Sequence, residues 1–224
     1  MKHQGTARSI RHQARGRCVR CLVVAALLPT LWVLTEDGSE AAGGNGLISG
    51  RVVSRRTRAA AAVVYVEKIP GQEFPPPHEH VVIDQKNLLF LPHVLPVLVG
   101  TVVDFPNSDK VRHSVFSSRK SAKRFNLGTY PAGELRSVVM DTPGAGVVTL
   151  LCNVHAEMSA YVVVVETPYF ATTDRRGHFK IEGVPPGAYE LSVWHEALRS
   201  QTKKDVIVKA GEATEVVFEK LKRR

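Results

Sequence analysis

Short valine-rich runs between turn residues are the feature that most constrains how this chain can fold. They recur throughout the sequence beyond residue 45, and Gly, Pro, Asn and Asp residues occur between them. No segment keeps a helical period over three turns, and short strands at this spacing are typical of sandwiches and barrels. We therefore expect an all-β protein, with strands at 47–53, 62–68, 81–84, 97–105, 111–116, 136–141, 146–152, 160–166, 178–182, 187–194, 204–209 and 214–219.

The composition excludes several classes of protein. Hydrophobic residues make up 44% of the 224 residues and charged residues 23%, which are ordinary globular values and not those of a disordered or collagen-like chain. A single apolar run approaches the length of a membrane span, so a polytopic membrane protein is excluded. The formal net charge is +9. Part of this positive charge belongs to the N-terminal segment.

Residues 1–42 are typical of a signal peptide. Six basic residues precede an apolar stretch at 21–34, which is short for a membrane span, and small residues at 41–44 offer a cleavage site. We therefore expect an exported, periplasmic protein with no membrane span after cleavage. An uncleaved N-terminal anchor is the alternative.

Export changes how the three cysteines are interpreted. Cys18 and Cys21 form a C-x-x-C pair, but the pair lies inside the predicted signal and has no second ligand pair. Cleavage of the signal leaves Cys152 alone in an oxidising compartment, where a thiol without a disulfide partner is open to oxidation. We therefore expect Cys152 to be deeply buried or to bind something.

The segment that follows suggests what it binds. Cys152, His155 and Met158 lie in a predicted loop between two strands, and His113 lies on or beside a strand further upstream. A thiolate, two imidazoles and a thioether are the ligand set of a blue-copper centre, with the thioether weak and axial. Each residue alone is usually a core or surface residue, but the combination favours a metal site.

Other chemistries are less well supported. The loop lacks the second cysteine of a binuclear copper centre, and the sequence holds one His-x-His pair, His78 and His80, where multicopper oxidases need several. That pair and His93 could each contact a metal, and their roles are open. Zinc accepts the same Cys and His ligands. No nucleophile and base are paired and no phosphate-binding loop is present, so we do not expect an enzyme.

Three motifs stand out in residues 78–166: Phe105-Pro106-Asn107 to His113-Ser114-Val115-Phe116, the Pro143-Gly144 turn, and C-x-x-H-x-x-M. Through these motifs, residues 78–166 resemble the cupredoxins, in particular amicyanin, plastocyanin and proteins labelled for methylamine utilisation. The resemblance implies a Greek-key β-sandwich with one type 1 copper ion, held by His113, Cys152 and His155 as equatorial ligands and Met158 as the axial one. Ser114 stands where the family often has Asn.

Residues 172–189 resemble the carboxypeptidase regulatory-like domain, a small transthyretin-type β-sandwich. The usual opening strands of that domain are missing just before residue 172, but similar runs occur upstream at 46–52 and 62–67. We expect residues 46–70 and 167–224 to form this sandwich, with the cupredoxin domain inserted at 78–166. In the alternative, sequential layout, residues 46–70 supply the first strands of the cupredoxin.

The sequence therefore predicts an exported carrier of single electrons. Basic clusters at 51–58, 110–124 and 220–224 favour an acidic redox partner, such as a c-type cytochrome or a dehydrogenase, and nucleic acid is not expected. A copper-handling protein and a structural or adhesive β-protein without metal are the alternatives. The oligomeric state, the reduction potential and the identity of the partner stay open.

Overall fold

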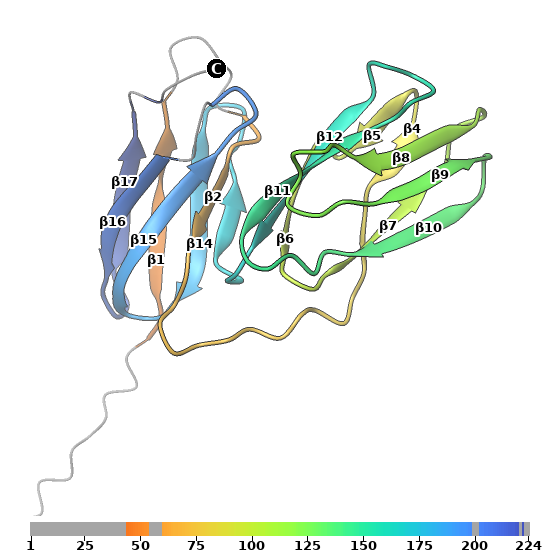
Figure 1. The fold of residues 1–224 in the computed structure, drawn as a ribbon. Helices are drawn as coiled ribbons and strands as arrows, with labels where there is room; N and C mark the ends of the chain where they lie inside the picture. The colour runs from red at the N-terminus through yellow and green to blue at the C-terminus, as the bar shows by residue number, and fades with distance from the viewer. Residues whose placement is uncertain (1–43, 54–59, 199–201, 220, 222–224) are drawn as a thin grey trace, which may run out of the picture. The chain divides into compact units, whose positions relative to one another are not determined.

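The computed structural model describes residues 44–53, 60–198, 202–219 and 221, and within these ranges all regular structure is β-strand (Figure 1). The all-β prediction is confirmed. The predicted signal peptide at 1–42, with Cys18 and Cys21, lies outside the described residues, as do most of the basic cluster at 51–58 and nearly all of that at 220–224. None of the described segments is a helix long and apolar enough to cross a membrane.

Two sheets form the first sandwich. One has the order β14-β1-β17 and the other β13-β2-β15-β16, and valines, leucines and isoleucines from both fill a shared core. Buried and exposed residues alternate along β14, as expected for a strand with one face on a core. The strands are β1 (Gly46–Val52), β2 (Val63–Val66), β13 (Phe170–Thr172), β14 (His178–Val184), β15 (Gly187–Trp194), β16 (Thr202–Val208) and β17 (Ala213–Phe218).

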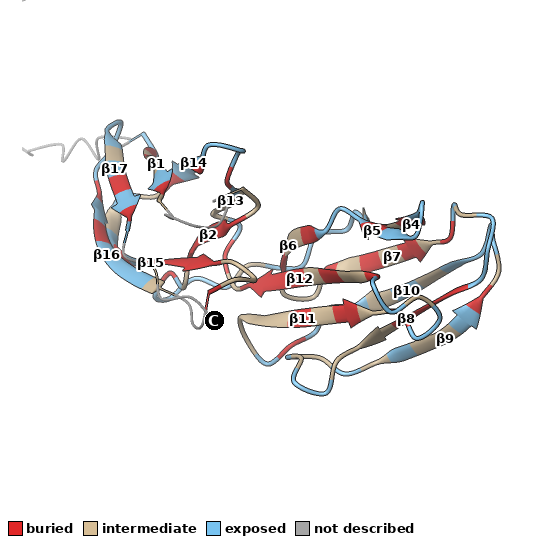
Figure 2. Ribbon diagram, turned by 90° about the horizontal axis from the view of Figure 1, so that it is seen from above, coloured by how far each residue is buried: buried red, intermediate tan, exposed pale blue. Residues whose placement is uncertain are grey.

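The second sandwich lies between these strands in the sequence. Its two sheets have the orders β10-β7-β3 and β6-β12-β11-β8-β9, and the hairpin β4-β5 accompanies them. Figure 2 shows buried residues along β12 and the more exposed strand β9. The strands are β3 (Val81–Val82), β4 (Asp84–Lys86), β5 (Leu89–Leu91), β6 (Val94–Leu98), β7 (Val102–Pro106), β8 (His113–Ser117), β9 (Asn126–Tyr130), β10 (Leu135–Val139), β11 (Gly146–Leu151) and β12 (Ser159–Val165).

The strand pairing bears on the domain layout. β1 pairs with β14 and β17, and β2 pairs with β13 and β15, so the first two strands of the described chain join strands beyond residue 169 (Figure 1). We infer from this that residues 46–70 and 167–224 make one sandwich and that residues 78–166 are inserted in it. The pairing argues against the sequential layout.

The single strand expected at 97–105 is wrong. The structure has two strands there, β6 and β7, separated by a turn in which Thr101 N donates to Leu98 O at 3.1 Å. Gly100 has φ +84°, and a Cβ on it would lie 2.7 Å from Pro76 Cβ. Only glycine tolerates this backbone and this contact, which explains why the chain turns here. The short strands β5, β9 and β13 were not expected.

The sheet order brings three segments together at one end of the second sandwich. β11 pairs with β12 on one side and with β8 on the other, with Leu151 opposite Phe116. The chain between β11 and β12 is a closed loop, since Cys152 N donates to Met158 O at 3.3 Å and Met158 N to His155 O at 3.1 Å. His113 begins β8, so strand pairing places it beside this loop.

Candidate metal centre

Three of the four predicted ligands converge at this end of the sandwich. One donor atom each from His113, Cys152 and His155 lies within 4.8 Å of the others. His113 and Cys152 are buried, and His155 is partly exposed. The two imidazoles face each other through their Nδ1 atoms, which lie 3.0 Å apart. In the part of the chain that the structure describes, this is the one group of three such donors from His, Cys, Asp or Glu side chains.

Ser114 ties the strand of His113 to the cysteine loop. Its backbone N–H donates to Cys152 Sγ at 3.5 Å and its hydroxyl lies 3.6 Å from the same sulfur. Asn153 N in turn donates to Ser114 Oγ at 2.9 Å. Ser114 is completely buried, so these contacts are shielded from water. A serine hydroxyl therefore holds the loop here, where the cupredoxins often have an asparagine.

The same contacts act on the acidity of the thiol. Burial raises the pKa of Cys152, but hydrogen bonds from the backbone N–H groups of Ser114, His155 and Val154 and from the Ser114 hydroxyl outweigh it, and the pKa lies below the ordinary value of a cysteine. The thiolate is the form that binds a metal. The loop therefore lowers the pH at which Cys152 becomes a thiolate.

Asp109 holds His113 from the other side. Its Oδ2 lies 3.1 Å from His113 Nε2, which leaves Nδ1 facing the cluster. A hydrogen bond from Leu88 N, at 2.9 Å, is the main cause of the lowered pKa of Asp109, followed by the bond to His113. A carboxylate on the far nitrogen of an imidazole orients the ring and raises its basicity as a ligand. Asp109 was not among the site residues predicted from the sequence, because its contact with His113 depends on the fold of the loop between them.

Asn107 shapes the segment between β7 and His113. Its Nδ2 donates to Val111 O at 2.9 Å and to Tyr130 O at 3.2 Å, and its Oδ1 accepts from Asp109 N at 3.1 Å. Asn107 is 1% exposed. One buried amide thus fixes the backbone on which Asp109 and His113 stand.

Met158, the predicted axial ligand, is 1% exposed and belongs to the same buried core cluster as Cys152. Its backbone closes the loop that carries Cys152 and His155. This burial is compatible with a ligand and also with a core residue. The axial role of Met158 stays a prediction.

The other candidate histidines lie outside the cluster. His80 Nδ1 lies 3.1 Å from both carboxylate oxygens of Asp104. His93 is bonded to Ser159 O at 3.0 Å through Nδ1 and to Glu196 Oε2 at 3.1 Å through Nε2. His78 is exposed. None of the three belongs to the group of converging donors.

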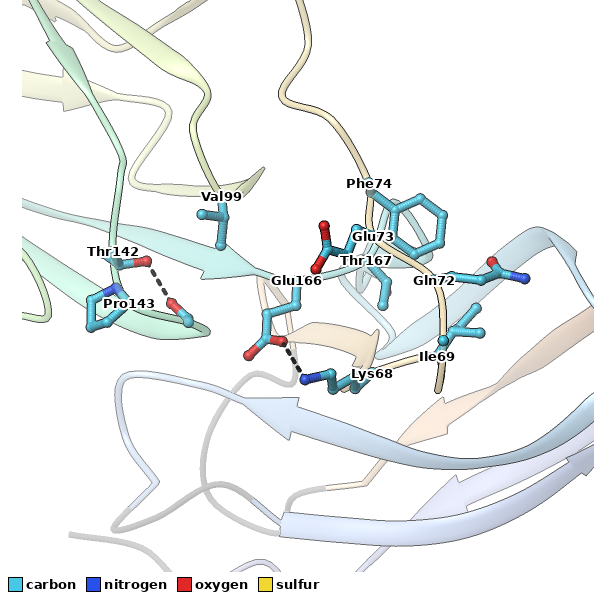
Figure 3. Close-up of a pocket in the computed structure, with 12 residues that line it drawn as sticks. Lys68, Ile69, Gln72, Glu73, Phe74, Val99, Thr142, Pro143, Glu166 and Thr167 are labelled. Carbon is cyan, nitrogen blue, oxygen red and sulfur yellow. Dashed lines mark hydrogen bonds and ion pairs between the residues drawn. The ribbon is translucent and has the colours of Figure 1, made fainter.

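A cavity of about 870 Å³ is lined by residues between positions 68 and 167 (Figure 3). The ion pair between Lys68 and Glu166, at 3.9 Å, stands at its edge. None of its lining residues is one of the metal donors. Its lining residues are Lys68, Ile69, Gly71, Gln72, Glu73, Phe74, Val99, Thr142, Pro143, Gly144, Glu166 and Thr167.

The donor set itself can be tested against a metal. One thiolate and two neutral imidazoles suit copper in both of its common oxidation states, and they also suit zinc. The three donors come from two segments that hydrogen bonds hold in place, and one of them, His155, reaches the surface. The residues present therefore fit a bound copper or zinc ion.

Comparison with known families supports the resemblance found at residues 172–189, in the first sandwich. The carboxypeptidase regulatory-like domain matches residues 138–220. The matched segment takes in β11 and β12, whose partners in the structure are β8 and β6, and it leaves out β1 and β2. No curated protein matches the chain.

Solved structures similar to this chain include cupredoxins. A purple cupredoxin from Nitrosopumilus maritimus is 24% identical and covers 38% of this chain and 98% of its own, with a TM-score of 0.33. A variant of amicyanin in its Cu(I) state is 21% identical and covers 38% of this chain and 81% of its own, with a TM-score of 0.35. A copper-containing nitrite reductase from Thermus scotoductus is 21% identical and covers 53% of this chain and 28% of its own, with a TM-score of 0.37.

Proposed function

We propose that the chain is an exported type 1 copper protein that carries single electrons between redox partners. The convergence of His113, Cys152 and His155 is the observation that supports this proposal. These three residues would be the equatorial ligands and Met158 the axial one. Copper bound there would supply one-electron chemistry by alternating between its two common oxidation states.

The residues around the cluster suit a carrier. Ser114 and Asp109 restrain the two buried ligands, and a restrained ligand set reorganises little when charge changes. His155 is partly exposed, and the neighbouring side chain of Val154 is 47% exposed, so a partner could approach the cluster at this loop.

The net charge of the chain and its N-terminal sequence support a proposal for the redox partner and for the compartment. Without residues 1–42, 24 Lys and Arg against 18 Asp and Glu leave a formal net charge of +6, which favours an acidic protein such as a c-type cytochrome or a dehydrogenase. Residues 1–42 favour export to the periplasm. We propose a transient complex with a small interface, since electron carriers must dissociate after each transfer.

A visible absorption spectrum tests the proposal. One equivalent of Cu(II) should give an intense thiolate-to-copper band, and Cys152→Ser should abolish it. His178→Gln, an exposed histidine of the first sandwich, is the matched control and should leave the band unchanged. A colourless protein that binds no copper would contradict the proposal and favour a structural β-protein.

Copper handling is the second candidate, and the partly exposed His155 favours it because an accessible ligand can exchange. Reversible one-electron voltammetry would support the carrier. Ready loss of copper to a chelator or to an acceptor protein would support handling.

A further inference from the structure

The loop between β8 and β9 carries a concentrated positive charge. Four basic residues stand within six positions, at Arg119, Lys120, Lys123 and Arg124, with no acidic residue among them. The backbone of this loop is tied to β11, because Ser118 N donates to Thr149 O and Ala122 N to Val147 O, each at 2.9 Å. The charges are therefore presented from a held segment of backbone.

Two of these charged residues, Arg119 and Arg124, line a surface cleft of about 640 Å³. Phe116, Phe125 and Leu151 supply its apolar part, and two arginines with serine and asparagine side chains supply the polar part. Leu151 is the residue directly before Cys152 in the sequence, so the lining of the cleft reaches the strand end from which the cysteine loop starts. The complete lining is Phe116, Ser117, Ser118, Arg119, Arg124, Phe125, Asn126 and Leu151.

Most of this charge has no oppositely charged partner among the described residues. Lys123 pairs with Asp141, whereas Arg119, Lys120 and Arg124 take part in none of the ion pairs formed between described residues. Like charges held close together repel, and an anion relieves the repulsion. Arginine side chains bind carboxylates through paired hydrogen bonds.

We propose that this cleft is the docking site for an acidic segment of the redox partner, an inference that rests on the proposed function. Carboxylates of the segment would bind Arg119 and Arg124, and an apolar side chain between them would cover Phe116, Phe125 and Leu151. A small inorganic anion would satisfy the arginines but would leave the apolar part in contact with water. The mixed lining therefore favours a peptide with acidic and apolar residues.

The test uses the copper-free chain and a capped Glu-Glu-Leu-Glu-Glu peptide at low ionic strength, followed by calorimetry and by NMR shifts of backbone amides. We expect saturable binding, with shifts concentrated at residues 116–126 and 151. The double variant R119E/R124E should weaken binding at least tenfold, and R119Q/R124Q should cause a smaller loss. A peptide with Gln in place of Glu should not bind measurably.

The matched control is R175E/R176E, which reverses two exposed arginines in the first sandwich and makes the same change in net charge. It should change the affinity less than twofold. An equal loss in both double variants would overturn the proposal, because binding would then follow only the overall field. Inorganic phosphate that competes as well as the peptide would also overturn it, in favour of a simple anion site.

The copper-free design separates this proposal from the proposed function. If the chain shows the thiolate-to-copper band but the peptide does not shift residues 116–126, the docking site is wrong and the copper site stands. If the peptide binds in the cleft and copper does not bind, an acidic-segment site remains and its redox role is wrong.

Discussion

The two sandwiches have similar apolar cores but differ in the polar side chains that they bury. Each has a core of valine, leucine and isoleucine from two facing sheets. The second sandwich also buries Asn107, His113, Ser114 and Cys152 near one end, where hydrogen bonds connect them. The first sandwich buries few polar side chains, and these include Ser192, which donates to Glu67 Oε1 at 2.5 Å. The candidate metal donors therefore depend on the residues at one set of strand ends, and the sandwich architecture alone does not supply them.

The largest expected effect comes from removing one leucine from each core. Leu150→Ala and Leu191→Ala should each lower the free energy of unfolding by about 2–5 kcal/mol, because both side chains are fully buried. Only Leu150→Ala should also weaken copper binding, since Leu150 packs in the cluster that contains Cys152. Urea denaturation and copper titration measure the two effects. A loss of copper affinity in Leu191→Ala would show that the copper site depends on the core of the first sandwich as well.

The next effect compares two buried serines. Ser114→Ala should reduce copper affinity by about 10- to 100-fold, because it removes the hydroxyl that bonds Cys152 Sγ and Asn153 N. Ser192→Ala removes a buried hydroxyl from the other sandwich and should leave copper affinity unchanged. Competition with a copper chelator measures both variants. Equal affinities for Ser114→Ala and the unaltered chain would show that the backbone alone holds the loop.

A smaller effect is expected at the carboxylate behind His113. Asp109→Asn should raise the reduction potential, because the neutral amide makes the imidazole a weaker donor and so stabilises the oxidised metal less. A tenfold change in the ratio of the two affinities corresponds to about 60 mV for one electron. Voltammetry measures the shift. Asp84→Asn alters a carboxylate that bonds Ser108 N on a neighbouring backbone, and it should leave the potential unchanged.

The smallest effect concerns acid stability. The Ser137 hydroxyl, which donates to Asp104 at 2.5 Å, and the neighbouring His80 hold the pKa of Asp104 below its ordinary value. The Asp104 carboxylate therefore binds a proton more readily in the unfolded chain than in the folded one. The stabilisation is complete above the unfolded pKa, near 3.9, and is lost as the pH falls through the lower folded pKa.

Ser137→Ala should reduce the loss of folding free energy in acid. The reduction should be less than about 1 kcal/mol, because Asp104 and its partners lie near the surface. Urea midpoints measured from pH 6 down to pH 2.5 follow the change. Identical pH profiles for the two proteins would show that Ser137 does not perturb Asp104.

Parts of the fold escaped sequence analysis for identifiable reasons. Strands β9 and β13 are short and interrupt polar or turn-rich segments, so their pairing with the neighbouring strands β8 and β2 decides that they are strands. The turn at Gly100 lies inside a continuous apolar run, which by pattern alone is one strand. The contact of Leu88 N with Asp109 joins segments 21 residues apart and has no local signal.

The sequence by itself determined the all-β class and the donor types, because both depend on local pattern: the alternation of apolar runs with turn residues, and the spacing of Cys152, His155 and Met158 in one loop. Only the tertiary structure decided that His113 meets that loop, 42 residues before His155. It does so because β8 pairs with β11, which brings Ser114 against Cys152. Strand pairing of this kind depends on packing over the whole sandwich, and no short segment encodes it.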